Sequence, residues 1–584
     1  MCSIIGYYGK NLAAPILVKG LERMEYRGYD SVGVATKSEN EIQVKKGVGK
    51  VIEVNNAIHL DDLPGITGIG HTRWATHGKV TDTNAHPHSS NSGKIAIVHN
   101  GIIENFQELK DDLISDGYNF QSDTDTEIIA NLIQKNFEKT SDVKQTIINT
   151  VSDLKGHYAF VVIFDDGTLA AARFHEPLIV GVGKNSHYLS SDVLGFIERT
   201  DDAIYIDNRD FVIVNDAGLE IYNFDGEQVK RQITKVSKEF ADVYKGDYAH
   251  YTLKEISEQP QTILRAGSDD KIDDIVSHMT SSKTLYITGS GTSYNSSRIA
   301  KYLMSKYAKL NIEPIISSEL QFAPDTIQND SVLVAISQSG ESADVLEAVR
   351  IAKESNAKIL SIVNHLNSSL SQESDVVIGL NCGPEIGVAA TKSFTSQLAV
   401  LYKITDKLCN GALKPDWAKV SDSISETLEN HSKIQELAKE LKDVSDIYVL
   451  GRGIHFPIAK EAALKLKELT YIHAEAIPGG ELKHGPLALM DENVFVIIIN
   501  PDDSTYTDTI NSANEIKARG AKIIGISDKK SDVYDYWIET PKIDESLYPL
   551  VEIIPIQLLA YYAAIEKDSD PDYPRNLAKS VTVK

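Results

Sequence analysis

Cysteine is scarce in this chain of 584 residues, which has only Cys2, Cys382 and Cys409. Thiols so far apart form neither a disulfide framework nor the paired hooks of a metal site, so we expect a reducing compartment, the cytoplasm. The first ten residues lack the basic and then apolar layout of a signal peptide. Long apolar runs are also lacking: residues 551–565 are the most apolar long segment, and because polar residues interrupt them they predict a buried helix rather than a membrane span.

Positive charge is scarce as well. Lys and Arg total 59 against 83 Asp and Glu, a formal net charge of -24. This charge disfavours nucleic acid and anionic membranes as partners, whereas a small phosphorylated molecule needs only one or two positive groups. The 42% hydrophobic and 24% charged residues are typical of a globular protein and exclude wholesale disorder. At roughly 100 to 200 residues per domain, the length predicts about three domains.

The pattern of elements changes along the chain. In the first 236 residues, short β-like runs alternate with a few helical segments and many turns, which predicts a sheet-dominated α+β domain. Residues 237–251 are charged and only weakly periodic, and we place a linker there. Beyond Lys283, strands alternate with helices of about 15 residues, which predicts α/β architecture built from parallel βαβ units.

The second region contains an internal repeat. The apolar runs Thr284–Gly289 and Asp446–Gly451 both end in glycine, and the next strand begins 42 residues after each of them, at Ser331 and Asn493. A third pair of strands follows at similar spacing. The repeat predicts two doubly wound parallel-sheet subdomains that arose by duplication. Two unrelated α/β domains with similar spacing are the alternative.

Hydroxyl side chains follow two neighbouring strands in the first half, in the segments 288–293 and 337–342. Parallel sheets bind ligands at the carboxyl ends of their strands, where helix N-termini offer N–H groups to anions. A sugar phosphate would fit these segments. The phosphate-loop motif of NTP-binding proteins is missing and the dinucleotide fingerprint is incomplete, which disfavours NTP and NAD. Taken singly, each segment is also an ordinary serine-rich helix cap.

A helix predicted around residues 459–468 carries a stripe of charge. Glu461, Lys465 and Glu468 are spaced i, i+4 and i+7 and therefore share one helix face. An exposed ladder of ion pairs is one interpretation. Proton transfer over a bound sugar is the other, because it needs a carboxylate beside an ammonium group. His484 lies in a glycine-bounded turn and is a candidate acid or base.

The N-terminus carries the sharpest pattern. If Met1 is removed, Cys2 holds a thiol and a free α-amine, so the amine can act as the base for its own nucleophile. An incidental small cysteine is the alternative. Arg73 can clamp an α-carboxylate and Asp125 an α-ammonium group, which describes an amino acid substrate. The Asn100 amide and the Gly101 N–H can form an oxyanion hole.

These motifs resemble one family in the same order along the whole chain. MCSIIGYYG, GHTRWATHG, VHNGIIEN and SDTDTE are similar to the glutaminase half of the glutamine:fructose-6-phosphate amidotransferases, and GTSYNS, ISQSGESAD, EIGVAATKSFTSQ, GGELKHGPLAL and PRNLAKSVTV to their sugar isomerase half. The resemblance implies an N-terminal nucleophile hydrolase with an αββα sandwich and two sugar isomerase subdomains. The implied parts are a glutaminase domain (1–236), a linker (237–251), sugar isomerase subdomains (252–430 and 431–570) and a catalytic tail (571–584).

In the glutaminase half, the resemblance implies that Cys2 attacks the side-chain amide of L-glutamine and that Asn100 and Gly101 hold the oxyanion. Trp74 would lie on the loop that closes the site, and the ammonia released would travel to the sugar inside the protein. The residues implied to bind glutamine are Arg73, Trp74, Thr76, His77 and Asp125, with Gly101 also at the head group.

In the isomerase half, Lys579 would form a Schiff base with C2 of fructose 6-phosphate. Glu468 would move a proton between C1 and C2, and His484 would assist ring opening, reaching in from the neighbouring subunit of a homodimer. The residues implied around the sugar phosphate are Ser293, Ser337, Gln338, Ser339, Ser342, Glu461, Lys465 and Arg575. The implied chemistry needs no cofactor or metal.

One departure from the family pattern concerns the nucleophile. Ser3 stands where the family commonly has glycine, and we expect its side chain to lie beside the thiol and to affect the glutaminase rate. Two alternatives to the synthase hypothesis stay open. One is a sugar-phosphate deglycase with an amidotransferase head, and the other is a sugar-phosphate sensor without turnover.

Overall fold

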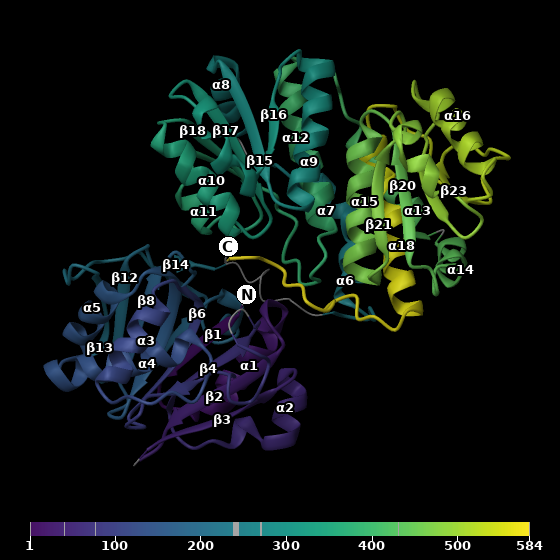
Figure 1. Cartoon of the computed structure of the whole chain (residues 1–584). Coiled ribbons are helices and arrows are strands. Elements are labelled where there is room, and N and C mark those ends of the chain that lie inside the picture. Colours follow the sequence, from purple (N-terminus) through teal and green to yellow (C-terminus); the bar gives the residue numbers. More distant parts are fainter. Residues whose placement is uncertain are drawn as a thin grey trace. The chain divides into compact units, whose positions relative to one another are not determined.

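The computed structural model describes residues 2–39, 41–75, 78–236, 245–268, 271–429 and 431–582. It divides into two compact units, residues 1–243 with 580–584 and residues 244–579 (Figure 1). Two of the predicted glutamine-binding residues, Thr76 and His77, lie outside the described residues, as does the 237–244 portion of the predicted linker.

The first unit is built on two antiparallel sheets. The eight-stranded sheet has the order β14 (Thr234–Lys235), β11 (Asp202–Tyr205), β9 (Ile179–Val182), β10 (His187–Ser190), β1 (Ser3–Tyr8), β4 (Thr67–Arg73), β2 (Ser31–Lys37) and β3 (Ile42–Val48). The six-stranded sheet has the order β13 (Gly218–Asn223), β12 (Asp210–Asn215), β8 (Leu169–Phe174), β7 (Gly156–Phe164), β6 (Ile95–Ile103) and β5 (His88–Ser89).

Apolar side chains on the inner faces hold these two sheets together. Ile4 and Ile69 of the larger sheet belong to the same buried cluster as Val98 and Val161 of the smaller one. Helix α1 (Ala13–Met24) packs against β1 and β4 on the outer face of the larger sheet. Helices α3 (Phe106–Ser115), α4 (Asp125–Thr140) and α5 (Val143–Asp153) form a second cluster with the smaller sheet. The predicted αββα sandwich is confirmed.

The second unit contains two five-stranded parallel sheets with the same strand order. The first runs β16 (Glu313–Ile316), β15 (Thr284–Gly289), β17 (Ser331–Ser337), β18 (Lys358–Val363) and β19 (Val376–Gly379). The second runs β21 (His473–Pro478), β20 (Asp446–Gly451), β22 (Phe495–Ile499), β23 (Lys522–Ser527) and β24 (Tyr536–Glu539). Two doubly wound subdomains are therefore present, as the repeated spacing predicted.

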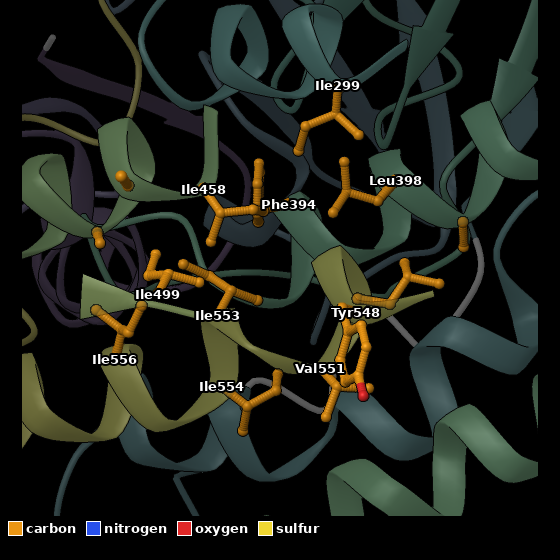
Figure 2. Close-up of a cluster of buried hydrophobic side chains, with 14 of the residues drawn as sticks. Ile299, Phe394, Leu398, Ile458, Ile499, Tyr548, Val551, Ile553, Ile554 and Ile556 are labelled. Carbon is orange, nitrogen blue, oxygen red and sulfur yellow. The ribbon is translucent and has the colours of Figure 1, made fainter. Parts of the chain in front are cut away.

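The two subdomains share one hydrophobic core (Figure 2). Ile299 on α9 (Thr292–Leu303) and Phe394 on α12 (Lys392–Leu408) come from the first half. They join the same buried cluster as Ile458 on α15 (His455–Thr470) and Ile553 on α18 (Ile553–Glu566) from the second. The remaining helices are α2 (Val51–Ile58), α6 (Tyr251–Ser257), α7 (Gln259–Arg265), α8 (Ile272–Ser281), α10 (Ala343–Glu354), α11 (Ser369–Gln372), α13 (Trp417–Glu429), α14 (Ser432–Glu440), α16 (Tyr506–Lys517) and α17 (Tyr548–Val551).

The most apolar helical segment lies in this core. Residues Tyr548–Glu566 are long and apolar enough to cross a membrane, but 89% of that apolar window is buried inside the fold. The surrounding side chains come from both subdomains, so the segment packs like the core helix of a globular protein. The expectation of a buried helix over 551–565 is confirmed.

Candidate active sites

Cys2 lies directly before β1, on the strand face that looks toward the second sheet. Side chains alternate along a strand, and Ile4, on the same face, is packed between the sheets. The Trp74 N–H donates to the Cys2 sulfur at 3.2 Å. Burial raises the pKa of the Cys2 thiol, and the Trp74 hydrogen bond and Arg73 act in the opposite direction. A thiol with a raised pKa needs a base close by before it can attack.

The predicted oxyanion hole lies next to this thiol. The Asn100 side-chain nitrogen, on β6, donates to the Cys2 carbonyl oxygen at 3.1 Å. Gly101 has a φ of 105°, and a Cβ there would lie 2.0 Å from the His157 carbonyl oxygen, so only glycine fits. The chain thus presents an amide group beside Cys2, followed directly on β6 by a position that only glycine can occupy.

Two charged residues predicted to hold an amino acid border the same place. Arg73 ends β4, and the β1–β4 register pairs Ser3 with Thr72, which puts Arg73 alongside Cys2. Asp125 begins α4, and its carboxylate accepts the Ile103 N–H at 2.9 Å, which ties the start of this helix to the end of β6. A cationic group therefore lies beside the thiol, and an anionic group is tied to the strand that carries the amide.

The expectation that the Ser3 side chain lies beside the thiol is wrong, while its effect on the glutaminase rate stays a prediction. Ser3 is fully buried, and its hydroxyl donates to the Met24 carbonyl oxygen at 2.7 Å. Neighbouring residues of a strand point to opposite faces, so the Ser3 side chain faces the α1 layer while Cys2 faces the other sheet. The serine is part of the packing between β1 and the end of α1 rather than a group beside the thiol.

In the second unit, hydroxyl groups gather at the carboxyl ends of β15 and β17, which are parallel neighbours. The Ser337 and Ser342 hydroxyl oxygens are 3.3 Å apart, and Ser337 also accepts the Gly340 N–H at 3.0 Å. The Gln397 amide donates to the Ser293 hydroxyl at 3.0 Å. Predicted sugar-phosphate residues from two strand ends therefore share one edge of the sheet, which is where open α/β sheets bind ligands.

The charged stripe on α15 is buried, so the interpretation as an exposed ladder is wrong. Glu461 and Lys465 are both 0% exposed. The Lys465 ammonium lies 2.6 Å from the Glu468 carboxylate and 3.4 Å from that of Glu461. Glu461 accepts from Thr292 at 2.9 Å and from Asn295 at 2.8 Å, both on α9. These bonds bring the α15 charges to the end of the first sheet that carries the hydroxyls.

Lys579 is held inside the second unit. Its ammonium lies 2.6 Å from the Glu385 carboxylate and donates to the Gly387 carbonyl oxygen at 2.8 Å. Burial disfavours the Glu385 charge, but Lys579 and Ser393 outweigh it and hold the pKa of Glu385 at about 2. The preceding Asp572 carboxylate accepts from the Tyr251 and Thr252 N–H groups at 2.8 Å each. The tail is therefore fixed by two anchors.

Two predicted residues lie apart from this cluster. His484 ends a short 3-10 helix (Leu482–His484), and its side chain is exposed. No hydrogen bond or ion pair within the described chain joins it to Glu468 or Lys579. Arg575 stacks over the Tyr471 ring at 4.2 Å and its backbone N–H donates to the Tyr471 hydroxyl. Arg575 therefore supports the tail in this structure.

Several contacts at the sites were not predicted. They involve Glu385, Gln397, Thr292 and Asn295, each bonded to a predicted residue far away in sequence. Glu385 and Gln397 lie in the EIGVAATKSFTSQ motif, so the motif was the available signal. It carried no indication of which side chain each would meet.

The folds and sites define a class: an N-terminal nucleophile amidotransferase joined to a duplicated sugar isomerase. Residues 71–197 match the glutamine amidotransferase domain family, and residues 278–405 and 440–567 match the SIS domain family. Over their full lengths, the chain is 42% identical to the glutamine–fructose-6-phosphate aminotransferase (isomerizing) of Pyrococcus horikoshii and 40% to that of Thermococcus kodakarensis. The chain belongs to the glutamine–fructose-6-phosphate aminotransferase (isomerizing) family.

Solved structures agree for the second unit. The C-terminal domain of the glucosamine-fructose-6-phosphate aminotransferase from Francisella tularensis is 37% identical, with a TM-score of 0.52. The match covers 56% of this chain and 100% of the solved chain. The tagatose-6-phosphate ketose/aldose isomerase from Escherichia coli is 20% identical, with a TM-score of 0.51. This match covers 56% of this chain and 95% of the solved chain. At that identity the second likeness shows the fold alone.

Proposed function

We propose that this protein transfers the amide nitrogen of L-glutamine to fructose 6-phosphate and releases glutamate and glucosamine 6-phosphate, the first step of amino-sugar biosynthesis. The observation that carries the proposal is the pairing of two sites in one chain. One site is the Cys2 thiol beside the Asn100 amide and Gly101. The other is the buried Lys579 in the second unit, where hydroxyl groups gather at the strand ends. The full-length similarity to the aminotransferases supports the same reaction.

At the first site, Cys2 would give its proton to its own α-amine and attack the side-chain amide carbon of glutamine. Asn100 and the Gly101 N–H would hold the oxyanion of the tetrahedral intermediate. The intermediate would expel ammonia and leave a thioester, which water hydrolyses to glutamate. Arg73 and Asp125 would bind the head group, with Trp74, Thr76 and His77 completing the site.

At the second site, the Lys579 amine would attack C2 of open-chain fructose 6-phosphate and form an imine with loss of water. Ammonia would then displace the lysine. Glu468 would take a proton from C1 and return one to C2, which turns the ketose imine into the aldose amine. His484, from the partner subunit, would assist ring opening.

The remaining predicted residues would bind or support the sugar phosphate. The exposed His484 in a single chain is compatible with a site completed across a homodimer. Hydroxyls at adjoining strand ends suit a phosphate group. The phosphate-binding and supporting residues are Ser293, Ser337, Gln338, Ser339, Ser342, Glu461, Lys465 and Arg575.

We also propose the functional parts of the chain. They are a glutaminase domain (1–236), a linker (237–251), sugar isomerase subdomains (252–430 and 431–570) and a catalytic tail (571–584). The matched family regions fall within three of these ranges. The cytoplasm is the proposed compartment, because a catalytic thiol must stay reduced.

The Cys2→Ala variant tests the proposal. Glutamine-dependent synthesis of glucosamine 6-phosphate should vanish, while conversion of fructose 6-phosphate to glucose 6-phosphate should survive. The matched variant Lys579→Ala should lose both sugar reactions and keep glutamine hydrolysis. Persistence of synthesis in Cys2→Ala would refute the N-terminal assignment.

A wild-type protein that binds the sugar phosphate without any turnover would be a sensor, and one that releases ammonia from an aminosugar without synthesis would be a deglycase.

Mass spectrometry of the purified N-terminus gives an independent check. The proposed base is the α-amine of Cys2, so the active protein must start at Cys2 rather than at Met1. Protein that retains Met1 should bind glutamine and fail to hydrolyse it.

A further inference from the structure

A cluster of buried histidines lies behind the proposed oxyanion hole. His71 on β4, His86 and His88 around β5, and His99 on β6 are each at most 5% exposed. The His71 and His86 ring centroids are 4.2 Å apart with the rings tilted by 31°, and the His88 ring meets His86 edge-on at 4.9 Å. The proposed thiol chemistry gives none of these rings a task.

His71 is the member of the cluster that contacts the oxyanion hole. Its Nε2 atom lies 3.0 Å from the His99 carbonyl oxygen and 3.2 Å from Oδ1 of Asn100. A carbonyl oxygen can only accept a hydrogen bond, so Nε2 carries the hydrogen atom. Burial lowers the pKa of His71 to about 3, so the ring is neutral at neutral pH and has one N–H to give. That single N–H is directed to these two oxygens.

This contact determines which way the Asn100 amide points. Its oxygen faces the His71 N–H, and its nitrogen donates to the Cys2 carbonyl oxygen at 3.1 Å. Turning the amide over would set two donors against each other at His71 and two acceptors against each other at Cys2. Leaving buried donors and acceptors unsatisfied in this way is unfavourable, so one orientation prevails. In that orientation the amide nitrogen, with its second hydrogen atom, lies on the Cys2 side.

We propose that His71 is a positioning residue that locks the Asn100 amide with its nitrogen toward the oxyanion formed at Cys2. The inference rests on the proposed roles of Cys2 and Asn100. The His86 ring packs against the His71 ring, and both side chains are buried, which restricts the movement of His71. Oxyanion stabilisation of this kind requires donors that are oriented before the reaction starts.

Glutamine hydrolysis by three His71 variants tests the role. His71→Leu removes the donor, and we expect kcat to fall about 10²-fold, the size of losing one oxyanion donor, with KM changed less than threefold. His71→Gln can place an amide nitrogen where Nε2 lies and should stay within about fivefold of the wild-type kcat. His71→Asn is too short to reach and should repeat the loss, which keeps the test intact if the leucine variant does not fold. His88→Gln, in the same cluster without contact to Asn100, is the matched control and should keep its kcat.

A double-mutant cycle separates positioning from general disruption. If His71 acts through Asn100, adding His71→Leu to Asn100→Ala lowers kcat no further. If the losses in kcat of the two single variants multiply in the double variant, the inference is overturned. It is also overturned if His71→Leu and His71→Asn both have a normal kcat while Asn100→Ala is impaired. A normal kcat for Asn100→Ala itself would instead refute the proposed oxyanion hole, and the positioning role with it. Conversion of fructose 6-phosphate to glucose 6-phosphate should be unchanged in all single variants, because it bypasses the thiol.

Discussion

The Lys579 ammonium lies 2.6 Å from the Glu385 carboxylate, and both side chains are at most 4% exposed. Glu385 also accepts the Thr391 and Ser393 N–H groups, at 2.9 and 3.0 Å, and the Ser393 hydroxyl at 2.7 Å. The loop before α12 therefore determines where the lysine of the tail sits. A charge held by so many donors stays ionised and keeps its partner in place.

Glu385→Gln should impair the sugar reaction alone. The amide keeps the shape of the side chain but removes the charge opposite Lys579, so we expect kcat for fructose 6-phosphate conversion to fall about tenfold or more. Borohydride trapping of the lysine–sugar imine should fall in parallel. Glutamine hydrolysis, measured on the same samples, is the internal control. An unchanged rate of imine trapping would contradict the predicted role of Glu385.

Lys465→Met should destabilise the second unit strongly. The substitution leaves Glu461, which is fully buried, and Glu468 without their cation. Breaking a buried ion pair from one side costs about 3–5 kcal/mol. Denaturant unfolding measures this loss of free energy. Lys467→Met, on an exposed position of the same helix, is the matched control and should stay within about 0.5 kcal/mol of wild type. Equal stabilities of the two variants would argue against a buried charge cluster.

The stability contributed by His455 should depend on pH. Burial opposes its charge, but Glu552 and Asp503, each 2.9 Å from a ring nitrogen, raise the pKa of His455 to about 10. The folded pKa lies above the unfolded value of about 6.5. Its contribution is therefore complete below pH 6.5 and is lost as pH rises through 10. The difference in unfolding free energy between wild type and His455→Gln should shrink over this range. A difference that is constant from pH 6 to 10 would show that the ring is neutral.

Ser3→Gly should leave glutamine hydrolysis nearly unchanged. The serine side chain faces α1 and not the thiol, so the kcat should stay within about twofold. The lost bond to Met24 and the added backbone freedom should cost about 1–2 kcal/mol of stability, measurable by thermal unfolding. A large change in kcat with unchanged stability would place the side chain at the active site after all.

The sequence predicts the fold well where the signal is local. Apolar runs that end in glycine at Gly289 and Gly451, with equal spacing to the next strand, predict the duplicated sheets because each element obeys its own short-range pattern. The i, i+4 spacing of Glu461 and Lys465 predicts their shared helix face. It leaves open whether that face is covered, because the covering residue Thr292 lies 169 positions away from Glu461.

The site was harder to predict for the same reason. The contact between Lys579 and Glu385 spans 194 positions, and the one between Asn100 and Cys2 spans 98. Residue type suggests that such groups are functional, but only folding shows which ones meet. The error at Ser3 had a different origin. Residues 2 and 3 are adjacent in sequence, but a strand turns neighbouring side chains to opposite faces, so Ser3 does not lie beside the thiol.

The core that joins the two sugar isomerase halves also limits what each half can do alone. Ile299, Phe394 and Leu398 of one half touch the same cluster as Ile458 and Ile553 of the other. A polypeptide that contains only one half would expose this apolar surface to water. It would then aggregate or associate with a second molecule that covers the surface. We therefore expect the two halves to unfold together, as one cooperative unit.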